Sequence, residues 1–307
     1  MHPQRARYLV AVAEHLSFTR AAAELFVAQS ALSQQIKVLE REVGAELIDR
    51  RGPRIGLTPA GEVAVSEARY LLTVADRGLA RIRAAALGSG GALDIALTRS
   101  WTGGVIGAAL AEFRRRFPEV AVTERRGYSS YNAELAAAGE IDLAVVRGPV
   151  ADERIRVRGC GAERLVVALP AGHPLADGGD GPALGAGPPI GRDRLRGEPV
   201  VFWERDNAPG MYDTIVSALW PDGTPRVVRR EADDEMVLRA VADGVGVAPM
   251  PVGRATAFRV PGVVLRELDP PAVELTVGVA TVDDNPNPAL RAFLDILERD
   301  PALGAVR

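Results

Sequence analysis

Residues 18–36 read FTRAAAELFVAQSALSQQI, and they carry the clearest structural pattern in the first part of the chain. Its pattern predicts two short helices that meet at a tight turn over residues 26–28. Alanines allow the two helices to approach closely, while Leu32 and Ile36 lie at helical spacing and face a core. This build is typical of a helix-turn-helix, whose second helix enters the major groove of DNA.

The second helix of this motif has a polar outer face. Its Gln, Ser and Lys side chains can hydrogen-bond base edges or phosphates, and a nearby arginine-rich tip over 50–54 suits a phosphate or the minor groove. We therefore predict that double-stranded DNA is contacted by Arg20, Gln29, Ser30, Ser33, Gln34, Lys37, Arg50, Arg51 and Arg54. A generic three-helix bundle with a solvated polar face is the alternative interpretation.

The residues after this motif predict a hairpin, a long helix and a hinge. The apolar stripe of the second helix (Ala31, Leu32, Ile36, Leu39, Val43) leads to Gly44, which predicts the helix end. Residues 46–58 predict a small hairpin, and Thr58-Pro59 predicts the start of a helix that runs to about residue 87. The narrow, near-heptad stripe of this long helix favours pairing with a second copy of the chain. A hinge is expected over 88–91.

From residue 92 the pattern changes to alternating strands and helices. Strands are expected at 92–98, 119–124, 141–146, 163–169, 199–203, 226–231, 245–249, 263–268 and 273–281. Helices are expected near 103–116, 131–138, 210–219, 233–243 and 288–299. The alternation predicts an α/β architecture with mostly parallel sheets. The Gly- and Pro-rich residues 177–191 are expected to form a surface loop.

Composition excludes several classes of protein. With 47% hydrophobic and 25% charged residues among 307, the chain is not mainly disordered. The single cysteine, Cys160, excludes an internal disulfide framework, and three scattered histidines argue against a metal site. No apolar run reaches the length of a membrane span, and the N-terminus reads as that of a mature cytoplasmic protein.

Charge and motif content narrow the function further. Residues 1–90 carry 12 basic and 9 acidic side chains, against 25 and 31 in the remainder, which weakly indicates a nucleic-acid-binding head. His173 has no neighbouring nucleophile motif, so no constellation supports an enzyme, and no cofactor is expected. A redox role for Cys160 through an internal disulfide would need a second cysteine.

Residues 5–72 resemble the N-terminal domain of the LysR-type transcriptional regulators. The resemblance is carried in order and spacing by Phe18-Thr19-Arg20-Ala21-Ala22, Ala31-Leu32-Ser33-Gln34-Gln35-Ile36, Leu39-Glu40, Gly44-Ala45-Glu46-Leu47 and Leu57-Thr58-Pro59-Ala60-Gly61. Looser matches continue along the chain, at 139–143, 169–175 and 243–247. Three residues depart from the family pattern: Ala28 replaces a capping Ser, Ile48 replaces Phe, and Gln34 often is Arg in relatives.

The resemblance implies an α+β multidomain protein. It would consist of a winged helix-turn-helix (1–58), a linker and dimerisation helix (59–87), a hinge (88–91) and a two-lobed, periplasmic-binding-protein-like (type 2) α/β domain (92–307). Lobe I would comprise 92–161 and 269–307, and lobe II 162–268. The family also implies promoter DNA, a small-molecule effector and self-association as partners, and favours a homotetramer over a homodimer.

Polar side chains at the ends of expected strands suggest where an effector binds. Hydroxyls and arginine at helix N-termini and strand ends favour an anion, most plausibly a carboxylate. By resemblance to the branch of the family that senses aromatic-pathway acids, the predicted contacts are Arg99, Ser100, Trp101, Thr102, Ser129, Arg147, Trp203 and Met211. For each of these residues, a purely structural role as helix cap, local ion pair or core side chain is the alternative.

The sequence therefore predicts a ligand-responsive DNA-binding regulator, without catalytic activity or metal. A constitutive regulator that binds DNA but no ligand is the alternative hypothesis. A stand-alone solute-binding protein would explain only residues 92–307.

Overall fold

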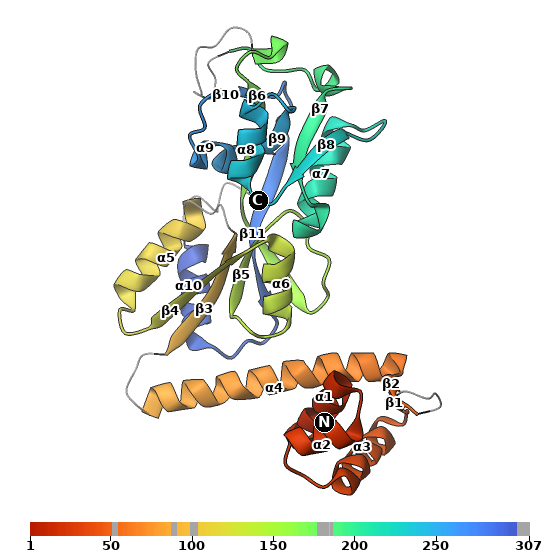
Figure 1. The fold of residues 1–307 in the computed structure, drawn as a ribbon. Coiled ribbons are helices and arrows are strands. Elements are labelled where there is room, and N and C mark those ends of the chain that lie inside the picture. The colour runs from red at the N-terminus through yellow and green to blue at the C-terminus, as the bar shows by residue number, and fades with distance from the viewer. Residues whose placement is uncertain (51–54, 87–90, 99–103, 177–183, 185–186, 300–307) are drawn as a thin grey trace. The chain divides into compact units, whose positions relative to one another are not determined.

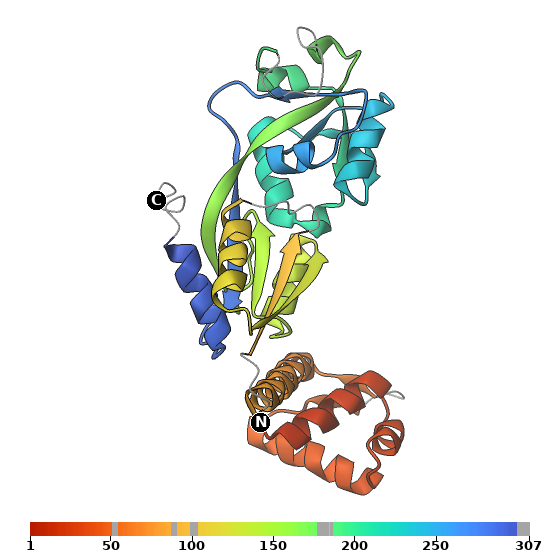
Figure 2. The same ribbon diagram turned by 90° about the vertical axis from the view of Figure 1, so that its left-hand side faces the viewer.

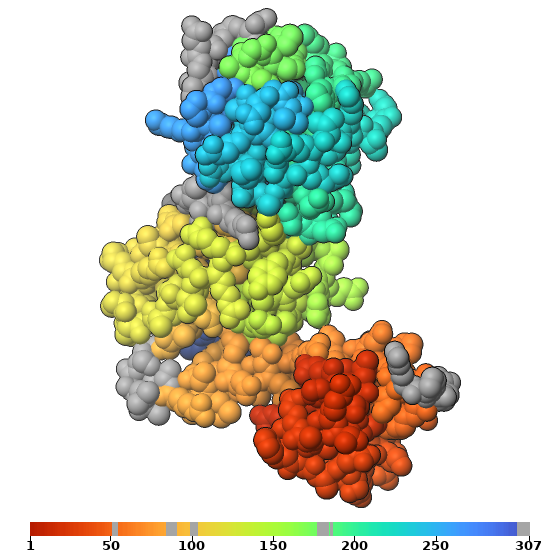
Figure 3. Space-filling model, in the orientation of Figure 1, coloured from red at the N-terminus to blue at the C-terminus, as the bar shows by residue number. Residues whose placement is uncertain are grey.

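A computed structural model describes residues 1–50, 55–86, 91–98, 104–176, 184 and 187–299 (Figure 1). The chain divides near residue 90 into two compact units. In the space-filling view, residues 1–86 form one body in red and orange (Figure 3). The hinge expected over 88–91 falls almost entirely outside the described residues, as does most of the loop expected over 177–191.

The N-terminal unit begins with three helices, α1 (Pro3–His15), α2 (Phe18–Glu24) and α3 (Gln29–Val43). Ser17 caps α2, since its hydroxyl accepts from the Arg20 backbone N–H at 3.3 Å. Ala28 precedes α3 and makes no side-chain cap, as its methyl group dictates. Gly44 ends α3 in the left-handed conformation with φ +76°, which confirms the predicted boundary.

The predicted apolar stripe of α3 is only partly buried. Leu32, Ile36 and Leu39 are buried, whereas Ala31 and Val43 are exposed. The stripe is narrower than predicted because α3 is held on one side, by α1, α2 and the following hairpin, and its opposite face stays open.

A hairpin and a long helix complete this unit. Strands β1 (Ile48–Asp49) and β2 (Gly56–Leu57) pair antiparallel, as predicted, with Ile48 opposite Leu57. Helix α4 (Pro59–Ala86) begins after Thr58, whose hydroxyl accepts from the Gly61 N–H at 3.0 Å. The first half of α4 packs on α1 through Ala64, Val65 and Ala68.

The first lobe of the C-terminal unit is a sheet with helices on both faces. Its elements are β3 (Ala92–Thr98), α5 (Gly104–Arg116), β4 (Ala121–Gly127), α6 (Ser129–Ala137), β5 (Leu143–Arg147), β11 (Glu274–Val282) and α10 (Pro288–Glu298). Strand β3 lies parallel to β4 and to β5. Phe113 of α5 and Phe293 of α10 pack together in the core on one face, and α6 covers a second, alanine-rich core.

The second lobe contains the remaining elements. These are η1 (Pro174–Ala176), η2 (Arg192–Leu195), β7 (Pro199–Trp203), η3 (Arg205–Asn207), α7 (Pro209–Leu219), β8 (Arg226–Glu231), α8 (Asp234–Ala242), β9 (Ala248–Pro251), α9 (Val252–Ala257) and β10 (Val263–Glu267). Strands β7 and β8 are parallel, and a buried apolar cluster lies among α7, α8 and the strands.

Strand β6 (Ile155–Pro170) serves both lobes and corrects two predictions. Its first part pairs with β11, and its second part pairs with β9 and β10, all antiparallel (Figure 2). The expected strand at 163–169 is therefore only the second half of the observed one. The expectation of mostly parallel sheets is wrong, because the strands that connect the lobes return beside one another in opposite directions.

Among the described residues, no helix is long and apolar enough to cross a membrane.

Candidate DNA interface and effector cleft

Helix α3 presents the predicted polar face. Gln29, Ser30, Gln34 and Lys37 are exposed, and Ser33 is half-buried between them and the core. Gln34, Lys37 and Arg50 border one open groove of about 680 Å³ between α3 and the hairpin. The structure thus brings side chains from the recognition helix and the hairpin to one surface.

The arginines near this surface are already engaged within the protein. The Arg20 guanidinium donates to the His15 carbonyl oxygen at 2.7 Å, at the end of α1. Arg50 pairs with Glu40 at 3.1 Å and lies over the Phe18 ring, 5.5 Å from its centroid. Arg51 and Arg54, also predicted to contact DNA, lie outside the described residues.

Glu40 is the residue that sequence reasoning missed here. Its buried carboxylate accepts from the backbone N–H groups of Leu47 and Ile48, at 3.0 and 3.2 Å, and from Arg50. One carboxylate on α3 therefore fixes the strand that leads into the hairpin tip. The sequence signals were its place in the family pattern, as Leu39-Glu40, and its position three residues before the end of α3 at Val43.

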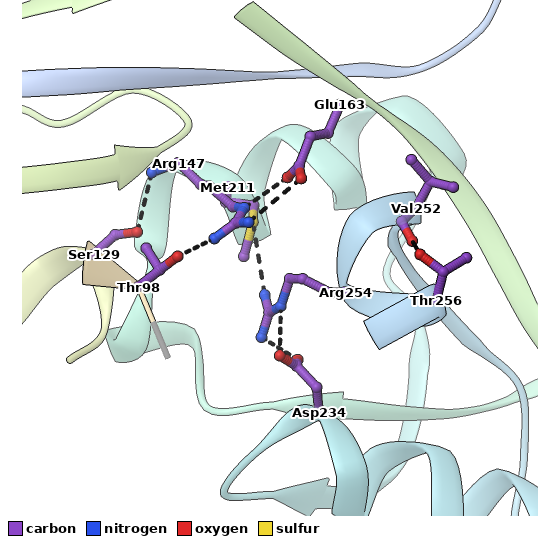
Figure 4. A network of polar contacts seen from close by, with 9 residues as sticks. All are labelled: Thr98, Ser129, Arg147, Glu163, Met211, Asp234, Val252, Arg254 and Thr256. Carbon is purple, nitrogen blue, oxygen red and sulfur yellow. Dashed lines mark hydrogen bonds and ion pairs between the residues drawn. The ribbon is translucent and has the colours of Figure 1, made fainter. Parts of the chain in front are cut away.

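In the C-terminal unit, Arg147 lies buried at the end of β5, where the sequence placed it. Its Nε donates to Glu163 of β6 at 2.7 Å and its Nη1 donates to the Thr98 hydroxyl (Figure 4). Ser129, at the first position of α6, accepts from the Arg147 backbone N–H at 3.1 Å. Ser129 thus holds the end of β5 in place.

A second buried arginine lies in the other lobe. Arg254 of α9 forms a bidentate ion pair with Asp234 of α8, with an Nε–Oδ2 distance of 2.8 Å (Figure 4). The Arg254 guanidinium also lies over the Trp203 ring, 4.7 Å from its centroid, and contacts the Met211 sulfur. Sequence reasoning identified Trp203 and Met211 but missed Arg254, Asp234, Glu163 and Thr98, because distant segments supply these partners.

Close contacts hold the two lobes together beside these ion pairs. The Tyr128 hydroxyl donates to the Ala232 carbonyl oxygen, and the Ser130 hydroxyl donates to the Asn207 carbonyl oxygen at 3.1 Å. Gly148 has φ +74°, and a Cβ there would come within 2.7 Å of the Met211 nitrogen. The backbone after β5 therefore approaches the start of α7 as closely as only glycine allows.

Arg147 borders two cavities. One is lined by Ser129, Trp203, Met211 and Arg254 and has a volume of about 30 Å³, which is room for about one water molecule. The other is lined by Gly104, Ile106, Cys160, Glu163 and Gly253 and has about 290 Å³, near the lower end of the range for small-molecule sites. The structure brings Ser129, Arg147, Trp203 and Met211 together, while Arg99, Ser100, Trp101 and Thr102 lie outside the described residues.

Burial raises the pKa of the Cys160 thiol, which lies beside Val279. Because the thiolate is the reactive form, we expect Cys160 in the folded protein to react with a thiol reagent at pH 7 about 100-fold more slowly than in the denatured protein. The measurement is the rate of thiol release from a disulfide reagent with and without denaturant. Equal rates would contradict a buried, unreactive thiol.

Among the described residues, no group of His, Cys, Asp and Glu is arranged to hold a metal.

Comparisons with known proteins agree with both units. Residues 3–62 match the family described as bacterial regulatory helix-turn-helix protein, lysR family, and residues 86–301 match the LysR substrate binding domain. The regulator AlsR of Bacillus subtilis (strain 168) is 29% identical over 96% of this chain and 95% of its own. TfdS of Cupriavidus pinatubonensis is 30% identical over 97% of this chain and 98% of its own.

A full-length CbnR structure solved in complex with its target DNA has the same fold, with a TM-score of 0.65 and 24% identity, over 97% of this chain and 99% of that one. A helix-turn-helix joined to a two-lobed effector-binding domain defines a DNA-binding transcriptional regulator rather than an enzyme. This chain belongs to the LysR family of such regulators.

Proposed function

We propose that this regulator binds operator DNA through the exposed face of α3 and the hairpin, and that a small carboxylate-bearing effector beside Arg147 controls its activity. The observation that carries the effector proposal is the Arg147–Glu163 ion pair, because its arginine is buried and borders both cavities at the junction of the lobes. The segments 1–58, 59–87, 88–91 and 92–307 would act as DNA-binding domain, dimerisation helix, hinge and effector domain.

The exposed face of α3 supports the DNA contacts. Gln29, Ser30, Gln34 and Lys37 can reach base edges or phosphates from a helix in the major groove, with Ser33 set deeper. Arg20 and Arg50 would contribute to phosphate contacts only from positions fixed by their partners within the protein.

Apolar side chains on α4 support self-association. Val63 and Ile82 are 64% and 67% exposed within one chain, and Leu79 is 48% exposed. Exposed apolar side chains along one long helix favour a second copy as their partner. We propose a homodimer through α4 that assembles further into a homotetramer.

The proposed effector would exchange with Glu163. Arginine binds carboxylates through two parallel hydrogen bonds, and Glu163 already occupies this fork. A ligand carboxylate in the 290 Å³ cavity would take its place on Arg147. Because Glu163 lies on β6, which pairs with strands of both lobes, the exchange would bias how the lobes close.

Two substitutions should therefore change effector affinity in opposite directions. Glu163→Gln removes the competing anion and should raise the affinity for a carboxylate about tenfold, whereas Arg147→Gln should lower it about tenfold or more. Calorimetric titration of the full chain with acetate, succinate and benzoate measures both effects. Arg158→Gln, an exposed arginine of β6 paired with Glu298, is the matched control and should leave affinity unchanged.

The outcomes separate the hypotheses. If Glu163→Gln lowers the affinity for these carboxylates, Glu163 supports their binding instead of competing with them, and the proposed exchange on Arg147 is wrong. If none of the three carboxylates binds and none alters DNA binding, the constitutive regulator is the better description.

A further inference from the structure

The turn between α2 and α3 contains an unusual residue for its backbone geometry. Val27 N–H donates to the Ala22 carbonyl oxygen at 3.0 Å, and Phe26 N–H donates to the Ala23 carbonyl oxygen at 3.2 Å. This pair of bonds is the Schellman motif, in which the residue in the position of Phe26 adopts the left-handed conformation. Phe26 has φ +53°. Glycine is the common residue there, because a bulky side chain is strained.

The Phe26 ring contributes little to the folded unit. Its side chain is 95% exposed, the highest value among the exposed large apolar side chains of the described residues. The apolar contact that usually accompanies this motif is made by the next residue, since Val27 packs against the core that contains Ala22. The domain therefore exposes an aromatic ring to water on a strained backbone, and no packing of the ring within the folded unit offsets the strain.

The position of the ring indicates that it contacts the ligand of the helix-turn-helix, which is DNA. Phe26 precedes Gln29, the first residue of α3, by three positions. Ala23, Ala28 and Ala31, which are near Phe26 in the sequence and are also exposed, have only methyl side chains. When the N-terminal end of α3 enters a major groove, the turn before it comes to lie beside the sugar–phosphate strand that borders the groove.

We propose that the Phe26 ring packs against the deoxyribose groups of that strand and is a DNA-contacting residue of the regulator; this inference rests on the proposed binding of DNA through α3. The sugar faces are the apolar part of the DNA backbone, and the ring offers neither charge nor a hydrogen bond to a phosphate or base. The contact adds affinity for any duplex and leaves sequence discrimination to the polar face of α3.

The test uses Phe26→Gly and Phe26→Tyr in the full chain, with the DNA upstream of its own gene and an unrelated duplex as probes. Phe26→Gly should weaken binding to both duplexes about tenfold, since it removes the apolar contact. The slope of log affinity against log salt should not change, because no phosphate charge loses its partner. Thermal unfolding followed by circular dichroism should show equal or higher stability, since glycine relieves the backbone strain. Phe26→Tyr keeps the ring and should bind as the wild type does.

Lys37→Gln provides the comparison, because loss of a cationic phosphate contact should reduce the salt slope by about one. If Phe26→Gly keeps wild-type affinity for both duplexes, the inference is wrong while the DNA-binding function stands. If Phe26→Gly lowers the affinity for the operator only, Phe26 reads bases and the inference of a deoxyribose contact is wrong. The inference is also wrong if sedimentation shows that Phe26→Gly dissociates the oligomer, because the ring would then contact another copy of the chain. Absence of binding by the wild-type protein would instead remove the DNA-binding function.

Discussion

Replacing Asp234 with alanine should lower the free energy of unfolding of the C-terminal unit by about 3–5 kcal/mol, because it leaves the buried Arg254 guanidinium without its carboxylate. The side chains of Arg254 and Asp234 are only 9% and 4% exposed, so solvent cannot replace the lost partner. Denaturant unfolding followed by tryptophan fluorescence measures the change, since Trp203 lies against Arg254.

Glu235→Ala is the matched control on the same helix. Glu235 pairs with Arg239, but the two side chains are 44% and 60% exposed, so water can replace the lost partner and the loss should stay below about 1 kcal/mol. Combining Asp234→Ala with Arg254→Met should recover much of the stability, since neither member of this pair then leaves a buried charge without its partner. If Asp234→Ala and Glu235→Ala lower the free energy of unfolding equally, the buried ion pair stabilises the unit no more than the exposed one.

Glu40→Ala should have the second large effect, on the N-terminal unit. It leaves the N–H groups of Leu47 and Ile48 without their acceptor and frees Arg50, which should cost roughly 3 kcal/mol or more. Because the hairpin loses its anchor on α3, affinity for DNA should fall about tenfold or more. Circular dichroism follows the unfolding of this helical unit.

The tryptophans provide an internal check on this prediction. All three lie after residue 100, so tryptophan fluorescence reports on the C-terminal unit and should not change in Glu40→Ala. Glu42→Ala is the control, since Glu42 is exposed and pairs with Arg5 at the surface. It should cost less than about 1 kcal/mol. Similar losses for the two variants would contradict an anchoring role for Glu40.

Local signals predicted the elements that local chemistry determines. Gly44 and Thr58-Pro59 marked helix ends correctly, because capping and left-handed backbone depend on one or two residues. The helices and strands from residue 92 onward were also close to those observed. The first half of β6 was missed: arginine and glycine in RVRGCGAER interrupt any apolar alternation, and that part of the strand forms only because β11 pairs with it.

Contacts between distant segments explain what sequence could not provide. Arg254 and Asp234 are 20 residues apart, and Arg147 and Glu163 are 16 apart on different strands. Nothing in the local pattern of either arginine indicates its carboxylate, so the charge balance of the cleft appears only in the folded chain. For the same reason the sequence predicted Arg50 as a DNA contact without indicating its partners within the protein, which are Glu40 and the Phe18 ring.

The order of strands in the first lobe has a consequence for synthesis. Strand β11 lies between β5 and β6, yet β5 ends at Arg147 and β11 begins only at Glu274. Synthesis proceeds at about 5–20 residues per second, so β11 would leave the ribosome on the order of ten seconds after β5. During that time one side of the nascent sheet exposes unpaired backbone groups to other chains. The N-terminal, DNA-binding unit has been synthesised in full by then. It can therefore fold on the ribosome before the sheet of the C-terminal unit is complete.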